Sequence, residues 1–110
     1  MKHSNYKFVI KCAECDIEFG ALRPHAKFCN RACRGVFNNR RASRGCELYD
    51  FVMSKRFDRY TEKECRGVID SLASGYRESD RAFRDGRKSW LPYRDALDAL
   101  GRLPGVADER

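Results

Sequence analysis

Two close pairs of cysteines, Cys12/Cys15 and Cys29/Cys33, constrain the fold of this chain more than any other feature of its sequence. The first pair has the two-residue gap of a tight turn, in which both sulfurs reach one metal ion. The second pair has the i, i+4 spacing that stacks two side chains on one face of a helix. The positive end of such a helix also stabilises anionic thiolates.

Four thiolates in this pattern match the tetrahedral preference of zinc, so we predict a Zn²⁺ site with the ligands Cys12, Cys15, Cys29 and Cys33. A closed site of four sulfurs leaves no position for water, which predicts a structural ion rather than a catalytic one. One alternative is that these cysteines are buried free thiols, which leaves the segment with few apolar residues and no cross-link. Another is that His25, between the pairs, replaces one cysteine.

The length of 110 residues allows one modest domain, or a small metal-held module joined to a helical one. Six cysteines in a secreted chain could form three disulfides, but the N-terminal sequence lacks the apolar region of a secretory signal. Cysteines spaced as metal ligands fit a reducing compartment, and we expect a cytoplasmic protein. No apolar run reaches the roughly 18 residues of a membrane helix, so we expect no membrane partner.

The first part of the chain has the pattern of a small α+β module. Apolar residues alternate with polar ones in a way that predicts a strand at Tyr6, Phe8 and Ile10. Residues 16–28 contain Gly20 and Pro24 and predict a short hairpin or a pair of loops. A helix is predicted from Cys29 to about Arg41, and residues 42–46 have the composition of a break.

The second part has helical periodicity. A helix is predicted over 47–59, and Thr61 and Glu64 have the spacing of a capping box that starts the next one. The apolar face of that helix is predicted at Cys65, Val68, Ile69, Leu72 and Tyr76, continued by Ser79 and Phe83.

A last helix is expected to have Ser89 as its cap and Pro92 in its first turn, and to end at Gly101 and Pro104. Its apolar stripe is predicted at Trp90, Tyr93, Leu97 and Leu100. The two remaining cysteines, Cys46 and Cys65, are expected to be small buried residues.

A motif of cysteines, aromatic residues and arginines covers residues 11–44. It combines Cys-x2-Cys, Phe19, a basic loop, the segment Phe28-Cys29-Asn30-x-x-Cys33-Arg34 and an Arg-rich helix. This pattern resembles the small treble-clef zinc proteins of bacteria and phages, whose helix commonly begins Phe-Cys-Ser-x-x-Cys-Arg; here Asn30 occupies the serine position. Similar families include zinc proteins that inhibit bacterial gyrase and zinc modules that bind nucleic acid.

Two later stretches, RGCELYDFVMSKRFDRY and RESDRAFRDGRKSW, resemble prophage proteins of alpha-proteobacteria that have no assigned activity. This resemblance implies a mobile-element setting. With the motif above, the sequence predicts a zinc-bound α+β treble clef over residues 1–45. An all-α helical hairpin or three-helix unit is predicted over 46–110.

The net charge of +7 lies entirely in the first part of the chain. Residues 1–45 contain ten Lys and Arg and three Asp and Glu, whereas residues 46–110 contain thirteen of each class. A focused positive field favours polyanions, among which nucleic acid is the commonest. The alternative is a solvated basic face that contributes only to solubility.

Five arginines flank or lie on the predicted post-zinc helix, and we predict that they contact phosphates: Arg31, Arg34, Arg40, Arg41 and Arg44. We expect DNA in preference to RNA, without base-specific recognition. A second basic cluster, from Arg77 to Lys88, is interleaved with acids, which favours ion pairs on a wet helix face.

The leading hypothesis is a non-enzymatic protein that binds nucleic acid or regulates a nucleic-acid process, with no small-molecule substrate. The rival hypothesis is a protein inhibitor or adaptor that docks on a polymerase, topoisomerase or nuclease, either as a DNA mimic through its acids or through Trp90 and Tyr93. A metal-dependent nuclease of the His-Asn-His class is disfavoured, because the two histidines, His3 and His25, lack the required pattern.

Overall fold

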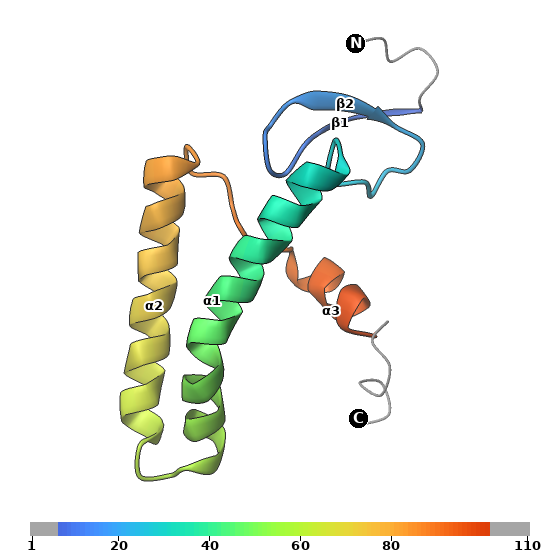
Figure 1. Cartoon of the computed structure of the whole chain (residues 1–110). Coiled ribbons are helices and arrows are strands. Elements are labelled where there is room, and N and C mark those ends of the chain that lie inside the picture. The colour runs from blue at the N-terminus through green and yellow to red at the C-terminus, as the bar shows by residue number, and fades with distance from the viewer. Residues whose placement is uncertain (1–6, 102–110) are drawn as a thin grey trace.

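The computed structural model describes residues 7–101 and consists there of a two-stranded hairpin followed by three helices (Figure 1). The elements are β1 (Phe8–Lys11), β2 (Glu18–Ala21), α1 (Arg31–Phe57), α2 (Glu62–Phe83) and α3 (Tyr93–Gly101). Tyr6, His3 and Pro104, which entered the sequence-based predictions, lie outside the described residues.

The hairpin confirms the predicted strand at Phe8 and Ile10. Strands β1 and β2 pair antiparallel, with Ile10 opposite Phe19 and Phe8 opposite Ala21. These four side chains lie on one face of the ribbon, where Phe19 and Ala21 are buried. Phe19 and Ala21 form a small core with Cys12, and the partly buried Ile10, Ala26 and Phe28 pack against this core.

Helix α1 is longer than the sequence predicts. It runs without interruption through residues 42–46, so the predicted break there and the predicted helix end near Arg41 are wrong. The composition of residues 42–46 led to that prediction, but in the structure Gly45 is an exposed helical residue with open space around its Cα. Arg40 and Arg44 on the inner face of α1 form ion pairs with other segments, and these contacts favour a continuous helix across this stretch. The helix therefore crosses the proposed boundary between residues 45 and 46, and the division into two domains stays a prediction.

Helices α1 and α2 pack side by side as an antiparallel hairpin (Figure 1). The predicted apolar face of α2 is confirmed, because Cys65 is buried and the side chains of Val68, Ile69, Leu72 and Tyr76 are half-buried. Phe83 does not continue this face and is 84% exposed. The reason is that the last turn of α2 instead directs Asp80 and Arg84 inward, where both are buried.

Two smaller predictions for the helical hairpin are also wrong. Cys46, which was predicted to be buried, is exposed. Thr61 precedes α2, but its side chain forms no capping hydrogen bond to the helix. Its hydroxyl instead donates to the Asp58 carbonyl oxygen, 3.4 Å away, within the loop that joins the two helices.

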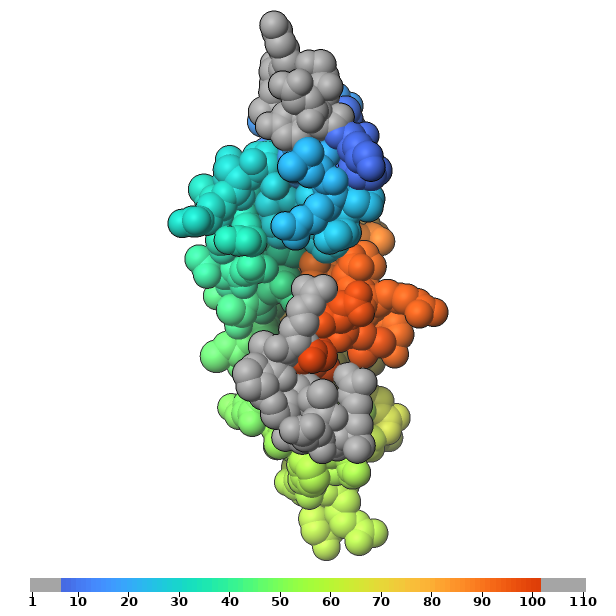
Figure 2. Space-filling model, turned by 90° about the vertical axis from the view of Figure 1, so that its right-hand side faces the viewer, coloured from blue at the N-terminus to red at the C-terminus, as the bar shows by residue number. Residues whose placement is uncertain are grey.

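Helix α3 begins after Pro92, whose carbonyl oxygen accepts a hydrogen bond from the Ala96 amide. Ser89 is not its cap, because this residue is buried and bonded to Asp80. The four residues of the predicted apolar stripe are all exposed: Trp90, which precedes α3, and Tyr93, Leu97 and Leu100 on it. Figure 2 shows α3 beside the N-terminal part of the molecule and the first half of α1. There Lys27, in the segment between β2 and α1, forms an ion pair with Asp95 of α3 at 2.7 Å.

The observed order confirms the predicted fold class of a small α+β module with four clustered cysteines, followed by a helical hairpin and a further helix. The end of the α1–α2 helical hairpin that lies farthest from the cysteines projects away from the other elements (Figures 1 and 2). Between residues 7 and 101, no helix combines the length and the apolar character needed to cross a membrane.

The continuity of α1 can be tested at Gly45. Replacing glycine by alanine inside an exposed helix is expected to raise the free energy of unfolding by about 0.5–1 kcal/mol. The control is Gly86→Ala, where a φ of +80° penalises any side chain, so that variant loses about 1 kcal/mol. Urea unfolding of both variants measures these changes. A loss of stability in Gly45→Ala would contradict a continuous helix.

Candidate metal centre and arginine network

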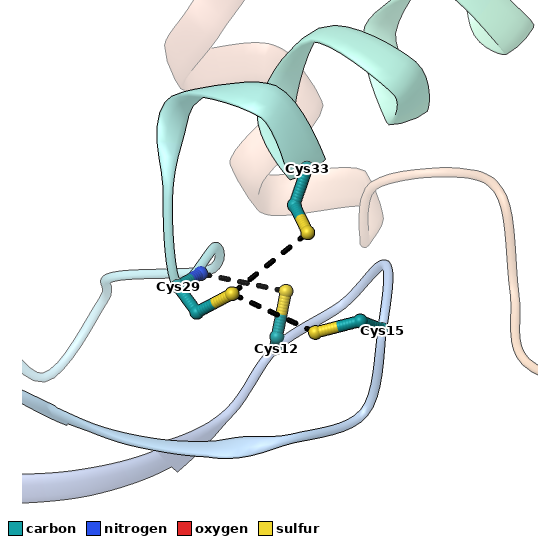
Figure 3. A group of neighbouring side chains, drawn as sticks. All are labelled: Cys12, Cys15, Cys29 and Cys33. Carbon is teal, nitrogen blue, oxygen red and sulfur yellow. Dashed lines mark hydrogen bonds between the residues drawn. The ribbon is translucent and has the colours of Figure 1, made fainter. Parts of the chain in front are cut away.

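The four predicted ligand cysteines converge at the junction of the hairpin and α1 (Figure 3). Their sulfur atoms all lie within 4.8 Å of one another. The sulfur of Cys29 is 3.6 Å from that of Cys15 and 3.8 Å from that of Cys33. Because four soft donors surround one point, this group could hold a metal ion.

Backbone hydrogen bonds within the loop between β1 and β2 place the first two sulfurs. The Cys12 amide donates to the Ile17 carbonyl oxygen, and the Asp16 amide donates to the Cys12 carbonyl oxygen, each at 2.9 Å. Asp16 has a φ of 66°, a left-handed conformation that Asp tolerates better than most residues and that closes this loop. The loop is also tied to the later segment, because the Ala13 amide donates to the Lys27 carbonyl oxygen at 2.8 Å.

Asn30 places the second pair of sulfurs. It caps α1, and its side-chain oxygen accepts from the Cys33 amide at 2.8 Å. Its side-chain nitrogen donates to the sulfur of Cys29 at 3.4 Å. Both ends of the Asn30 amide are therefore used, the oxygen in capping the helix and the nitrogen in a hydrogen bond to a ligand sulfur.

The local environment favours a thiolate at Cys12. Burial alone would raise the pKa of this thiol, but hydrogen bonds from the backbone at Cys15, Cys29 and Glu14 lower it to about 6. The pKa of Cys33 is raised to about 12, first by burial and then by its neighbouring sulfurs. Four thiolates at this spacing would repel one another, so a bound cation would be needed to hold all four in the ionised form.

His25 is exposed and does not belong to the cluster of metal-ligating groups found among residues 7–101. The alternative in which it replaces a cysteine therefore has no support in the geometry. Helix α1 begins at Arg31, so Cys33 lies in its first turn whereas Cys29 precedes the cap. The prediction that the helix starts at Cys29 and carries both cysteines is therefore wrong.

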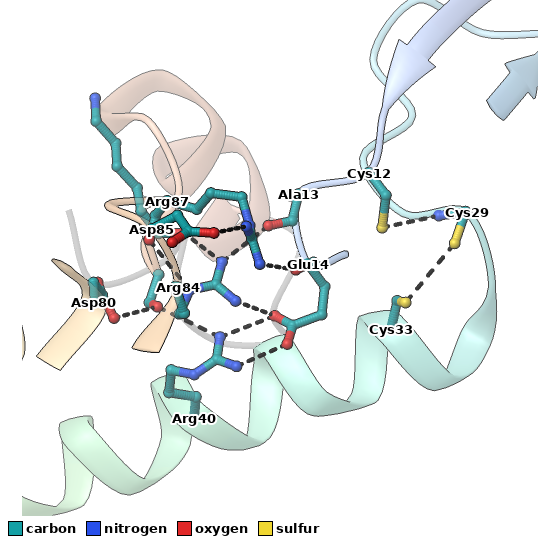
Figure 4. A network of polar contacts seen from close by, with 12 residues as sticks. Cys12, Ala13, Glu14, Cys29, Cys33, Arg40, Asp80, Arg84, Asp85 and Arg87 are labelled. Atoms are coloured by element: carbon teal, nitrogen blue, oxygen red, sulfur yellow. Dashed lines mark hydrogen bonds and ion pairs between the residues drawn. The ribbon is translucent and has the colours of Figure 1, made fainter. Parts of the chain in front are cut away.

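Glu14 is the functional residue that the sequence analysis missed. It lies between Cys12 and Cys15, and its carboxylate accepts hydrogen bonds from two arginines (Figure 4). Arg40 of α1 binds both carboxylate oxygens, at 2.8 and 3.0 Å, and Arg84 at the end of α2 binds one at 2.8 Å. The hydrogen bond from Arg40 is the main cause that lowers the pKa of Glu14.

Arg84 is the most enclosed member of this network. Only 7% of its side chain is exposed, and it also donates to the carbonyl oxygens of Ala13, Arg87 and Lys88. Arg87 donates to the Glu14 carbonyl oxygen at 3.2 Å. The loop that carries two ligand cysteines is therefore bound by side chains from α1 and from the segment after α2.

A second ion pair continues the network toward the helical hairpin. Asp80 is fully buried, pairs with Arg44 at 3.0 Å and accepts from the Ser89 hydroxyl at 2.9 Å. Burial opposes ionisation, but the hydrogen bonds from Arg44 and Ser89 hold the pKa of Asp80 below its usual value. Together, the Arg40–Glu14 and Arg44–Asp80 ion pairs fix α1 against the segment that leads into α3.

The five arginines that we predicted as phosphate contacts therefore separate into two sets. Arg40 and Arg44 point into the molecule and are engaged by Glu14 and Asp80. Arg31, Arg34 and Arg41 form no ion pair within residues 7–101. Their spacing of three and then seven residues places them on one face of α1, around its first turns.

The second basic cluster, Arg77 to Lys88, also divides. Arg81 and Glu78 form the exposed ion pair that the interleaved charges predict. Arg84 differs, since it is buried and pairs with Glu14, 70 residues away in the sequence. The prediction of a wet helix face is wrong for this residue.

Comparisons of the chain with protein-family models, with curated proteins and with solved structures found no match. The candidate site is thus defined by its own geometry: a four-cysteine cluster beside a β-hairpin, with a carboxylate in the first cysteine turn that binds two arginines.

The role of Glu14 can be tested by replacing it with glutamine. Glu14→Gln leaves Arg40 and Arg84 without a counter-charge in a mostly enclosed site, so the free energy of unfolding is expected to fall by about 3 kcal/mol. The matched control is Glu18→Gln on the exposed face of β2, which should change stability by less than about 0.5 kcal/mol. Equal effects of the two substitutions in urea unfolding would refute the structural role of Glu14.

A pH-dependent prediction concerns Asp80. Its pKa is lower in the folded state, so its stabilising contribution is complete above the unfolded pKa of about 4 and is lost as the pH falls through the folded value. Asp80→Asn is expected to cost about 3 kcal/mol at pH 7, because Arg44 is left unpaired. The difference in unfolding free energy between the two proteins should shrink below pH 4. A difference that does not vary with pH would show that the charge of Asp80 is unimportant.

Proposed function

We propose that the four cysteines bind one structural Zn²⁺ ion. Zinc–thiolate bonds of about 2.3 Å give a tetrahedron with sulfur–sulfur edges of about 3.8 Å. The Cys15–Cys29 and Cys29–Cys33 separations of 3.6 and 3.8 Å match that length. Because all four donors are sulfurs, the ion keeps no position for water or substrate, and its role is to hold the hairpin against α1.

The metal prediction has a direct measurement. Purified protein is expected to contain one zinc ion per chain by elemental analysis, and Cys33→Ser should retain almost none after dialysis against a mild chelator. Cys46→Ser is the control, since this exposed cysteine lies outside the cluster and its loss should leave the zinc content unchanged. Substoichiometric zinc in the parent protein, or equal loss in both variants, would contradict the proposal.

We further propose that the protein binds duplex DNA through the exposed face of the first turns of α1. The observation that carries this proposal is that Arg31, Arg34 and Arg41 share one face without carboxylate partners among residues 7–101. The other two arginines of the original prediction are bound within the protein and supply no contact. The first turn of α1 has no acidic residue, so the positive end of the helix adds to this field.

The DNA proposal predicts a steep dependence of affinity on salt. In fluorescence anisotropy titrations with a 20-base-pair duplex, Arg31→Gln and Arg34→Gln should each lower the slope of log K against log salt by about one. The control is Arg81→Gln, because Arg81 is exposed but already paired with Glu78 on α2. Absence of binding at low salt would exclude the proposal.

A second candidate function is docking on a protein of the nucleic-acid machinery, without enzymatic activity. The observation that favours it is the number of large apolar side chains left at the surface of the helical part. Phe57, Tyr60 and Phe83 are 72%, 88% and 84% exposed, and Trp90 and Tyr93 are also exposed. If the duplex titrations show no binding, this function replaces DNA binding as the better-supported one.

A further inference from the structure

A hollow of about 440 Å³ lies between α1, α2 and the segment that precedes α3. Its volume falls within the roughly 300–1,000 Å³ typical of small-molecule and cofactor sites. It is separate from the cysteine cluster, since no cysteine lines it. The Arg44–Asp80 ion pair and the hydrogen bond from Ser89 to Asp80 hold its walls in place, because Arg44 and Ser89 both line the hollow.

The walls of this hollow are apolar and partly aromatic. Leu48 and Ala73 line it from the two facing helices, and the rings of Tyr76 and Trp90 add flat surfaces. Tyr76 is held by a 2.6 Å hydrogen bond from its hydroxyl to Glu47 and by the guanidinium of Arg44, 4.9 Å from the ring centre. Trp90 remains 48% exposed, so its indole is accessible to a ligand.

Arginines stand at the edge of the same hollow. Arg41 and Arg77 line it, and neither forms an ion pair with a carboxylate within residues 7–101. Arg41 is held by Asn38 at 3.1 Å, and Arg77 by the Gly86 carbonyl oxygen at 3.3 Å, which orients the two side chains without neutralising them. No Asp or Glu lines the hollow. The site therefore combines a flat apolar interior with unneutralised positive charge at its edge.

We propose that this hollow binds one unstacked nucleotide of a single-stranded nucleic acid, with its base against Trp90 and its phosphates on Arg41 and Arg77. Aromatic rings beside guanidinium groups are the combination by which proteins bind unpaired nucleotides. Arg41 also belongs to the basic face of α1, so a strand bound along that face leads directly to the hollow. The inference rests on the proposed function in so far as both assign nucleic acid as the partner, but it names a different site and a different strand form.

Trp90 is the one tryptophan of the chain and reports directly on this site. A six-nucleotide oligodeoxyadenylate, titrated at low salt, is expected to quench its fluorescence, and deoxyadenosine without phosphate should bind at least about tenfold more weakly. Two variants test the location: Ala73→Phe fills the hollow and Trp90→Ala removes the stacking surface. Each should weaken binding of a labelled strand by about tenfold or more. The control is Arg81→Gln, on α2 but outside the hollow, which should bind as the parent does.

The outcomes separate this proposal from that of duplex binding. If the variants Ala73→Phe and Trp90→Ala no longer bind the single strand but keep the parent affinity for the duplex, the two sites are distinct and both proposals stand. If single strands quench Trp90 while duplexes do not bind, only the duplex proposal fails. Binding of the labelled strand without quenching of Trp90, unchanged affinity in Ala73→Phe, or no binding of single strands at low salt would each overturn the nucleotide site.

Discussion

The structure depends on the convergence of four sulfurs from two parts of the chain, the loop between β1 and β2 and the segment where α1 begins. Within residues 7–101 the buried apolar residues are only Cys12, Phe19, Ala21, Phe37 and Cys65, and one of these is itself a member of the cluster. So small a core offers little hydrophobic stabilisation against the entropy lost on folding. A metal ion bound by the four thiolates would supply what the core does not, because its binding free energy contributes directly to folding.

Glu14 extends the influence of the metal centre to the helices. It lies between two ligand cysteines, so a fixed loop presents its carboxylate to Arg40 and Arg84 at the right distance. Those arginines come from α1 and from the end of α2, and Arg44 with Asp80 repeats the arrangement one helical turn further along α1. Part of the basic charge of the first 45 residues is thus used internally. What remains for a partner is the set Arg31, Arg34 and Arg41, which form no ion pair within residues 7–101.

Sequence patterns predicted the features that depend on local spacing. Short-range periodicity and spacing indicated the four-cysteine cluster, the strand at Phe8 and Ile10, and the inner face of α2, and all three are present.

Three kinds of error had physical causes. The composition of residues 42–46 was given too much weight as a helix break, although the tertiary ion pairs of Arg40 and Arg44 favour continuation of α1. Arg40 and Arg44 were predicted to contact phosphates, and Arg84 to lie on a wet helix face. Their acidic partners, Glu14 and Asp80, could not be identified because they are distant in sequence. The apolar stripe of α3 showed amphipathicity but not whether anything covers it.

The central claim is that the metal bound by the four sulfurs holds the hairpin and, through Glu14, the helices. The most direct test is amide hydrogen exchange of the zinc-loaded protein and of the same protein after the metal is removed, with elemental analysis as the check. The account predicts that removal abolishes protection in β1 and β2 and at Cys33, and weakens it in the segment around Ser89, while the distal part of the α1–α2 hairpin loses less. Unchanged protection of β1 and β2 in verified metal-free protein would contradict it.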